Sequence, residues 1–199
     1  TPLLQEPYIA FLGARYRGPN STLVTPASDV CIEAFPRSAN TFLVQALRLS
    51  TKRELEIAHH LHSPIQLTRS VKLGIPAVVI VRNPLECYTS LKLKTPNLSV
   101  KVMHRVYARF HEQALDHARH IHFARYEDVI NEPGKVIAQI HRWIGSGDET
   151  AAAFDKDAVF KAIDEAKKKR EGARALSDAR RFATSLARPT AEKEVAKHA

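Results

Sequence analysis

The feature that most constrains this chain is a short apolar stretch, 30–35, which ends at a proline and restarts as a helical pattern. The stretch is rich in β-forming residues, as a buried strand should be, and from Thr41 the apolar residues recur on one helix face. Arg37 and the small polar residues Ser38 and Asn40 lie in the loop between them. Because such a loop presents unpaired N–H groups at a helix N-terminus, it can hold an anion. The alternative to an anion-binding loop is an ordinary capped turn between a strand and a helix. The loop is not a Walker A motif, because the G-x-x-x-x-G-K-[ST] spacing is absent.

A second strand–turn–helix pattern begins at 75–81, a near-continuous run of β-branched residues typical of a strand buried on both faces of a parallel sheet. An Arg-Asn-Pro sequence starting at Arg82 ends this strand, and a helix is expected over 85–93. Ser90 follows Arg82 by eight residues. A guanidinium at the strand end and a hydroxyl in the next helix can therefore face one phosphate. The alternative is a surface pair between Arg82 and Glu86.

The rest of the chain continues the alternation of strands and helices. A strand is expected over 121–126, and helices are expected over 41–49, 64–72, 100–117 and 133–144. This order predicts an α/β fold with three layers, α/β/α, around a short central parallel sheet. We expect one domain over 1–199, with its functional motifs within 30–144 and a basic helical tail over 150–199.

Three segments resemble the cofactor motifs of sulfotransferases that use 3′-phosphoadenosine 5′-phosphosulfate (PAPS). Pro36-Arg37-Ser38-Ala39-Asn40-Thr41-Phe42 is similar to the family's 5′-phosphosulfate loop, P-[KR]-[ST]-G-[TN]-T-[WF]. The segment from Arg82 to Ser90 matches R-[ND]-P-x-[DE]-x-x-x-S, and the segment from Tyr126 to Pro133 resembles Y-E-D-[LMV]-x-x-x-P. The resemblance covers about 30–144 and implies the P-loop NTPase-like topology of sulfotransferases.

The resemblance implies transfer of a sulfuryl group from PAPS to a hydroxyl or amine, leaving adenosine 3′,5′-bisphosphate (PAP). The expected 3′-phosphate ligands are Arg82 and Ser90, and Tyr126 is expected beside the adenine. The implied ligands of the 5′ end, with an aromatic residue near the adenine, are Arg37, Ser38, Ala39, Asn40, Thr41 and Phe42. Ala39 stands where the family usually has glycine, and we expect its backbone to stay at negative φ.

Three histidines, His59, His60 and His62, lie within four positions. In cytosolic sulfotransferases a Lys-Thr-His-Leu-Pro segment carries the catalytic base, and His60-Leu61 resembles its His-Leu pair. We therefore expect His60 to take the acceptor proton, with His62 and His59 as alternatives, and Arg37 to stabilise charge on the transferring group. Imidazole suits this role because it titrates near neutral pH. A metal site at His60-x-His62 and histidines on an exposed strand end are the other interpretations, and we expect no metal.

The net charge of +9 favours anionic partners, but 161–199 alone holds eleven Lys and Arg against six Asp and Glu. Such a tail is usually a solvated helix face, so nucleic acid is an unlikely partner. The family's R-K-G motif for the 3′-phosphate has a partial counterpart here, 169–172, in which Arg170 could serve.

We expect a small-molecule or carbohydrate acceptor, no transmembrane segment and a cytoplasmic location, since no signal-peptide pattern is present. The two cysteines, Cys31 and Cys87, fit buried packing in a reducing compartment. The oligomeric state stays open. The alternative functions are a nucleotide-dependent kinase and a catalytically inactive relative that binds PAP or another nucleotide.

Overall fold

The computed structural model describes residues 23–146 and 155–186, and it has an α/β fold, as predicted. Its four-stranded sheet has the order β2-β1-β3-β4, and all neighbouring strands are parallel. The strands are β1 (Val30–Ala34), β2 (Ile57–His59), β3 (Ala77–Val81) and β4 (Ile121–Arg125). The sequence pattern does not predict β2, because its three residues merge with the histidine segment that follows.

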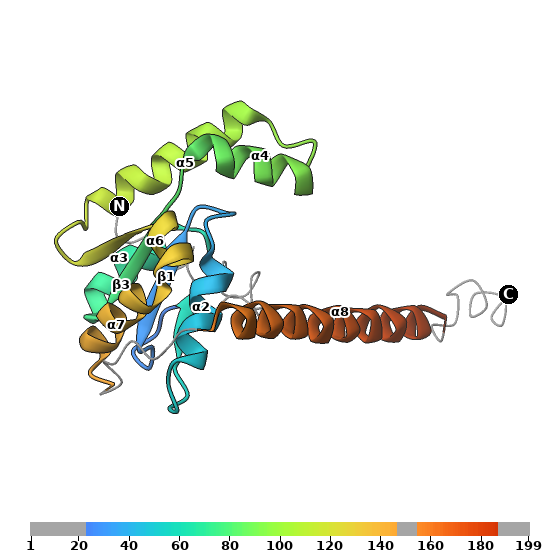
Figure 1. Ribbon diagram of the computed structural model, residues 1–199. Helices are drawn as coiled ribbons and strands as arrows, with labels where there is room; N and C mark the ends of the chain where they lie inside the picture. Colours follow the sequence, from blue (N-terminus) through green and yellow to red (C-terminus); the bar gives the residue numbers. More distant parts are fainter. Residues whose placement is uncertain (1–22, 147–154, 187–199) are drawn as a thin grey trace, which may run out of the picture. The chain divides into compact units, whose positions relative to one another are not determined.

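Helices flank this sheet, as Figure 1 shows. They are α2 (Asn40–Leu49), α3 (Pro64–Leu73), α4 (Pro84–Lys94), α5 (Val100–Leu115), α6 (Tyr126–Asn131), α7 (Pro133–Ile144) and α8 (Lys156–Leu186). The expected helix boundaries are confirmed to within a few residues for α2 to α5 and α7. Gly74 ends α3 in the left-handed conformation, and Pro133 stands in the first turn of α7.

The connections between strands place helices on both faces of the sheet. The chain moves from β1 outwards to β2 through α2, and in the opposite direction from β3 to β4 through α4 and α5. Because crossovers between parallel strands are right-handed, opposite directions put these helices on opposite faces. On one face, Cys31 and Val79 pack with Leu67 of α3 and Phe110 of α5 in a buried cluster. On the other side, α2 packs against β1 and α7.

The strand order reverses between β1 and β3, the two central strands. The loops that follow these strands therefore lead to opposite faces and leave a crevice at the carboxyl edge of the sheet. The loop 36–39 follows β1 and Arg82 follows β3, so both predicted phosphate-binding segments lie at this switch point. The topology alone, without any resemblance, marks this edge as the place where a ligand is expected.

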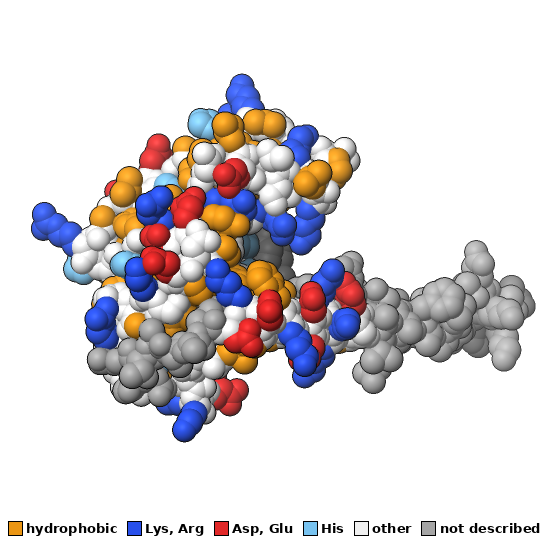
Figure 2. Space-filling view, in the orientation of Figure 1, with side chains coloured by type: hydrophobic (Ala, Val, Ile, Leu, Met, Phe, Trp, Pro, Cys, Tyr) orange, Lys and Arg blue, Asp and Glu red, His pale blue; other side chains and the backbone are white. Residues whose placement is uncertain are grey.

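The chain divides into two compact units, 1–160 and 161–199, and the site lies in the first. On the surface of the first unit, exposed apolar residues of α4 and α5, such as Leu93 and Val102, are interspersed with basic side chains (Figure 2). In the second unit, α8 continues to Leu186. Among the described helices, none is long and apolar enough to span a membrane.

Candidate active site

The loop after β1 turns sharply because two of its residues have left-handed backbone conformations. The φ angle is 74° at Arg37 and 64° at Ala39. The expectation that Ala39 keeps a negative φ is therefore wrong. Ala39 is the N-cap of α2, and the turn from the strand into the helix imposes this conformation on it. An alanine in the left-handed region costs about 1–2 kcal/mol, so strain is stored in the loop.

Replacing Ala39 with glycine is expected to raise the free energy of unfolding by about 0.5–1 kcal/mol. Glycine removes the left-handed strain, which stabilises the folded state. It also increases the entropy of the unfolded chain, and this offsets part of the stabilisation. Urea denaturation of the wild type and Ala39→Gly measures the difference. Ala46→Gly, in the middle of α2, is the control and should destabilise the protein. A loss of stability in Ala39→Gly would contradict the strain.

Asn40, the first residue of α2, has a buried side chain with no hydrogen-bond partner. Its exposed fraction is 4 %, and neither Oδ1 nor Nδ2 is paired within the described structure. The N-cap residue of α2, Ala39, makes no side-chain hydrogen bond to the start of the helix. Leaving a buried polar group unsatisfied costs about 1–3 kcal/mol, so such groups call for a specific explanation. A polar ligand held at this loop is the explanation that also uses the N–H groups at the N-terminus of α2.

Arg82 connects the end of β3 to the loop after β1 and to α6. Its Nη1 donates to the carbonyl of Arg37 at 2.7 Å, and its guanidinium carbon lies 4.0 Å from the ring centroid of Tyr126. The alternative surface pair is also present, since Nε lies 3.0 Å from a carboxylate oxygen of Glu86. The Tyr107 hydroxyl donates to the Arg82 carbonyl at 2.7 Å. These contacts fix the orientation of a guanidinium that can make paired bonds to a phosphate.

The loop after β1 also contacts α4. The Arg37 Nε donates to Ser90 Oγ at 2.8 Å, and Ser38 Oγ lies 3.4 Å from Cys87 Sγ. Burial raises the pKa of the Cys87 thiol, so the thiol stays protonated near neutral pH. The two predicted anion-binding segments therefore meet directly, side chain to side chain.

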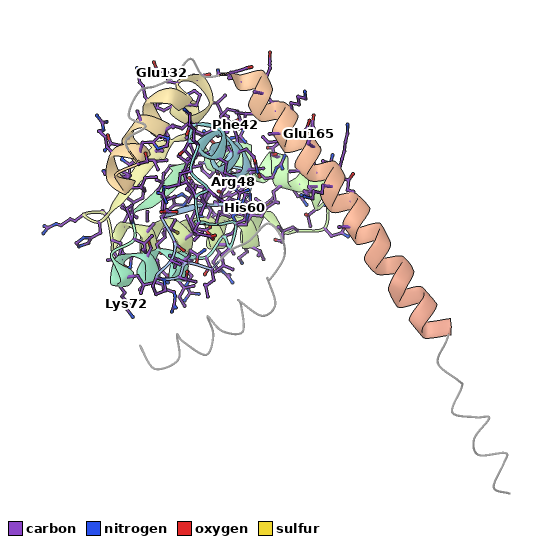
Figure 3. The ribbon with its side chains drawn as sticks, turned by 90° about the horizontal axis from the view of Figure 1, so that it is seen from below. Phe42, Arg48, His60, Lys72, Glu132 and Glu165 are labelled. Carbon is purple, nitrogen blue, oxygen red and sulfur yellow. The ribbon has the colours of Figure 1, made fainter. Side chains whose placement is uncertain are left out.

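The histidine segment after β2 reaches the same loop. His60 Nε2 lies 2.9 Å from Thr41 Oγ1, and its Nδ1 lies 2.6 Å from Nδ1 of His59. Figure 3 labels His60 together with Phe42 and Arg48 of α2. The backbone is left-handed at His60 and His62, with φ of 61° and 52°. Non-glycine residues hold this conformation only where the surrounding structure imposes it.

The buried carboxylate of Glu33 imposes the conformation of this segment. Its Oε1 accepts the Leu61 N–H at 2.9 Å, and its Oε2 accepts the His62 N–H at 2.8 Å. Burial raises the pKa of Glu33 to about 8, although these hydrogen bonds and one from Gln66 act in the opposite direction. Sequence reasoning missed Glu33. The available signal was a charged residue inside an otherwise apolar strand.

His62 lies between the end of β1 and a cavity of 480 Å³. Its Nδ1 is 2.7 Å from the carbonyl oxygen of Ala34, which can only accept, so the ring donates there and carries its lone pair on Nε2. Burial lowers the pKa of His62, which favours this neutral form. The cavity lies between α3 and α5, and its lining also includes Pro64, Thr68, Arg109, Phe110 and His117.

The contacts of the histidines do not resemble a metal site. His60 Nε2 is directed to Thr41, whereas His62 Nδ1 is directed to the Ala34 carbonyl, so these nitrogens do not converge. In the part of the chain that the structure describes, no three His, Cys, Asp or Glu side chains are grouped as metal ligands.

The roles expected for Phe42 and Arg170 stay predictions. Phe42 is buried, and its ring packs against Phe160 with 5.5 Å between centroids. The side chain of Arg170 lies outside the described residues, as do residues 187–199 of the basic tail. The other predicted residues lie in four segments joined by the contacts above (Arg37, Ser38, Ala39, Asn40, Thr41, His60, Arg82, Ser90 and Tyr126).

No protein-family model and no curated protein matches this sequence. Among solved structures, the fold is similar to the crystal structure of mouse sulfotransferase SULT7A1 complexed with PAP, with a TM-score of 0.48 and 12 % sequence identity. The similarity covers 69 % of this chain and 63 % of that chain, so this chain spans less than two thirds of that protein. Such a similarity concerns the course of the backbone and does not extend to the residues of the site.

Proposed function

We propose that this protein is a sulfotransferase that moves a sulfuryl group from PAPS to a hydroxyl or amine acceptor and releases PAP. The observation that carries the proposal is the contact between the two segments that the sequence resemblance assigns to opposite ends of one nucleotide. Arg37 donates to Ser90, and Arg82 donates to the Arg37 carbonyl. A nucleotide with phosphates at both ends fits two adjoining anion sites better than a nucleotide phosphorylated at one end does.

In this proposal each segment has a separate task. Arg37, Asn40 and Thr41 hold the 5′ end at the N-terminus of α2, where donors can stabilise charge on the transferring group. Arg82 and Ser90 hold the 3′-phosphate, which competes with Glu86 for the guanidinium. Tyr126 lies against Arg82 and offers its ring to the adenine. PAPS supplies the activated sulfuryl group, and the protein supplies position and charge.

The acceptor is proposed to bind in the cavity between α3 and α5, with His62 as its base. Both ring nitrogens of His60, the base expected from the sequence, already lie within hydrogen-bond distance of Thr41 and His59. His62 has the Nδ1–H to carbonyl arrangement that orients a basic Nε2, and it lines the cavity. The apolar surface of Phe110 beside Thr68 and Arg109 suits a small acceptor with a hydroxyl group, such as a phenol.

Calorimetry with PAP, 5′-AMP and Mg·ATP tests the nucleotide site. We expect the wild type to prefer PAP and Arg82→Ala to bind PAP about 2–3 kcal/mol more weakly, roughly 30- to 150-fold. The preference for PAP over 5′-AMP should disappear in this variant, because Arg82 acts on the 3′-phosphate.

Arg53→Ala is the matched control, because Arg53 pairs with Asp29 in a surface ion pair and has no assigned ligand. It should bind PAP like the wild type. Equal affinities of the wild type for PAP and 5′-AMP would contradict the proposal. Tight, Mg²⁺-dependent binding of ATP would favour a kinase. PAP binding without turnover of PAPS would identify an inactive relative.

A further inference from the structure

A continuous chain of polar contacts runs from the C-terminal turn of α2 back to its N-terminal turn. Arg48 Nη2 lies 3.5 Å from His59 Nε2, His59 Nδ1 lies 2.6 Å from His60 Nδ1, and His60 Nε2 lies 2.9 Å from Thr41 Oγ1. Arg48 is exposed, whereas His59 is 4 % exposed. This series of contacts therefore begins at the surface, passes through a buried imidazole and ends at the Thr41 hydroxyl in the first turn of α2.

Arg48, the first residue in this series of contacts, determines the direction in which the hydrogen bonds are donated. A guanidinium can only donate hydrogen bonds, so Arg48 requires the lone pair of His59 on Nε2. The 3.5 Å separation is long for a hydrogen bond, but the positive charge favours a lone pair there in any case. A neutral His59 then carries its hydrogen on Nδ1 and donates to His60 Nδ1. His60 consequently carries its hydrogen on Nε2 and donates to Thr41.

We propose that His59 and His60 are positioning residues that, under the control of Arg48, turn the hydroxyl hydrogen of Thr41 towards the anion held at the N-terminus of α2. A threonine hydroxyl has one hydrogen and two acceptor positions. When His60 occupies an acceptor position, the hydrogen is left for another acceptor, and a phosphate or sulfuryl oxygen is such an acceptor. The nature of that anion rests on the proposed function, but the direction of the chain does not.

Two structural features hold the His60 ring against Thr41. His60 is held at a φ of 61°, a strained conformation that brings its ring to Thr41. The next two residues, Leu61 and His62, are fixed through their N–H groups by the carboxylate of Glu33. The role of His60 in this scheme is to orient Thr41, and the acceptor proton goes to His62.

Nitrogen-15 NMR of the imidazole rings tests the direction of the chain without any ligand. In the wild type at pH 8, we expect the hydrogen on Nδ1 in His59 and on Nε2 in His60. The Arg48→Met variant should lose this preference and show mixed tautomers, and Arg48→Lys, which can also only donate, should restore it. Arg53→Met removes a charge from the segment that follows α2 and should leave both tautomers unchanged. A hydrogen on Nδ1 of His60 in the wild type would overturn the proposal.

PAP affinity then measures the positioning effect. We expect Arg48→Met and Thr41→Val each to weaken PAP binding about two- to tenfold, the value of one hydrogen bond, and Arg48→Lys to recover most of the loss. The double variant should be no weaker than Thr41→Val, because both changes remove the same interaction. Fully additive losses would overturn the positioning role. If the wild type binds no PAP, the proposed function fails, and the NMR result still decides the direction of the chain.

Discussion

Replacing His62 with asparagine is expected to lower kcat for sulfuryl transfer by about 10²- to 10⁴-fold, the usual contribution of a general base. Asparagine can keep the hydrogen bond to the Ala34 carbonyl through its amide nitrogen, and it removes the basic Nε2 of a residue that lines the cavity. PAP affinity should stay within about twofold of the wild type, because His62 is not a proposed nucleotide ligand. The measurement is PAP release from PAPS, with 2-naphthol as the phenolic acceptor.

The pH profile separates a base from a residue that only supports the cavity. Burial lowers the pKa of His62 from its ordinary 6.5, so the neutral, active form persists below that pH. We therefore expect wild-type kcat/KM to be constant near neutral pH and to fall only below pH 6.5, and this acid limb should vanish in His62→Asn.

His60→Gln is the comparison, because glutamine can still donate to Thr41. It should keep kcat within about tenfold of the wild type. If His60→Gln loses activity and His62→Asn keeps it, His60 is the base, as the sequence first suggested.

The sequence predicts the parts of this structure that depend on local patterns. The β-branched run before Arg82 and the break before Thr41 each specify a strand, a loop and a helix within about twenty residues. The resemblance to sulfotransferases implies one nucleotide site for Arg37, Arg82 and Tyr126, and each of these residues follows a strand at the carboxyl edge of the parallel sheet. The structure joins them by the Arg82 contacts with the Arg37 carbonyl and the Tyr126 ring.

The features that the sequence did not predict depend on contacts between distant segments. Ala39 is left-handed because the chain must turn from β1 into α2, and alanine gives no local sign of that strain. Glu33 meets the N–H groups of Leu61 and His62 only because β1 and β2 are neighbours, and β2 itself is too short to recognise. The ring contacts of His60 and His62 likewise depend on a backbone conformation that a distant residue, Glu33, fixes through hydrogen bonds.

The free energy of unfolding is expected to fall as the pH rises from about 5 to 8, because Glu33 binds a proton more tightly when folded. Its pKa is raised from 4.5 to about 8 by burial. Between these values the unfolded chain has released the proton and the folded chain has kept it, so stability decreases with pH. The slope from this group approaches about 1.4 kcal/mol per pH unit, and the total loss by pH 8 is several kcal/mol.

Urea denaturation of the wild type and Glu33→Gln at several pH values isolates this contribution. Glutamine offers one oxygen where the carboxyl group of Glu33 offers two, so the variant should be less stable than the wild type at pH 5, where the wild-type carboxyl is protonated. The two stability curves should then converge as the pH rises, because only the wild type must ionise a buried group. Parallel curves from pH 5 to 8 would show that Glu33 is already ionised in the folded protein at pH 5. In that case its hydrogen bonds with Leu61, His62 and Gln66 outweigh its burial.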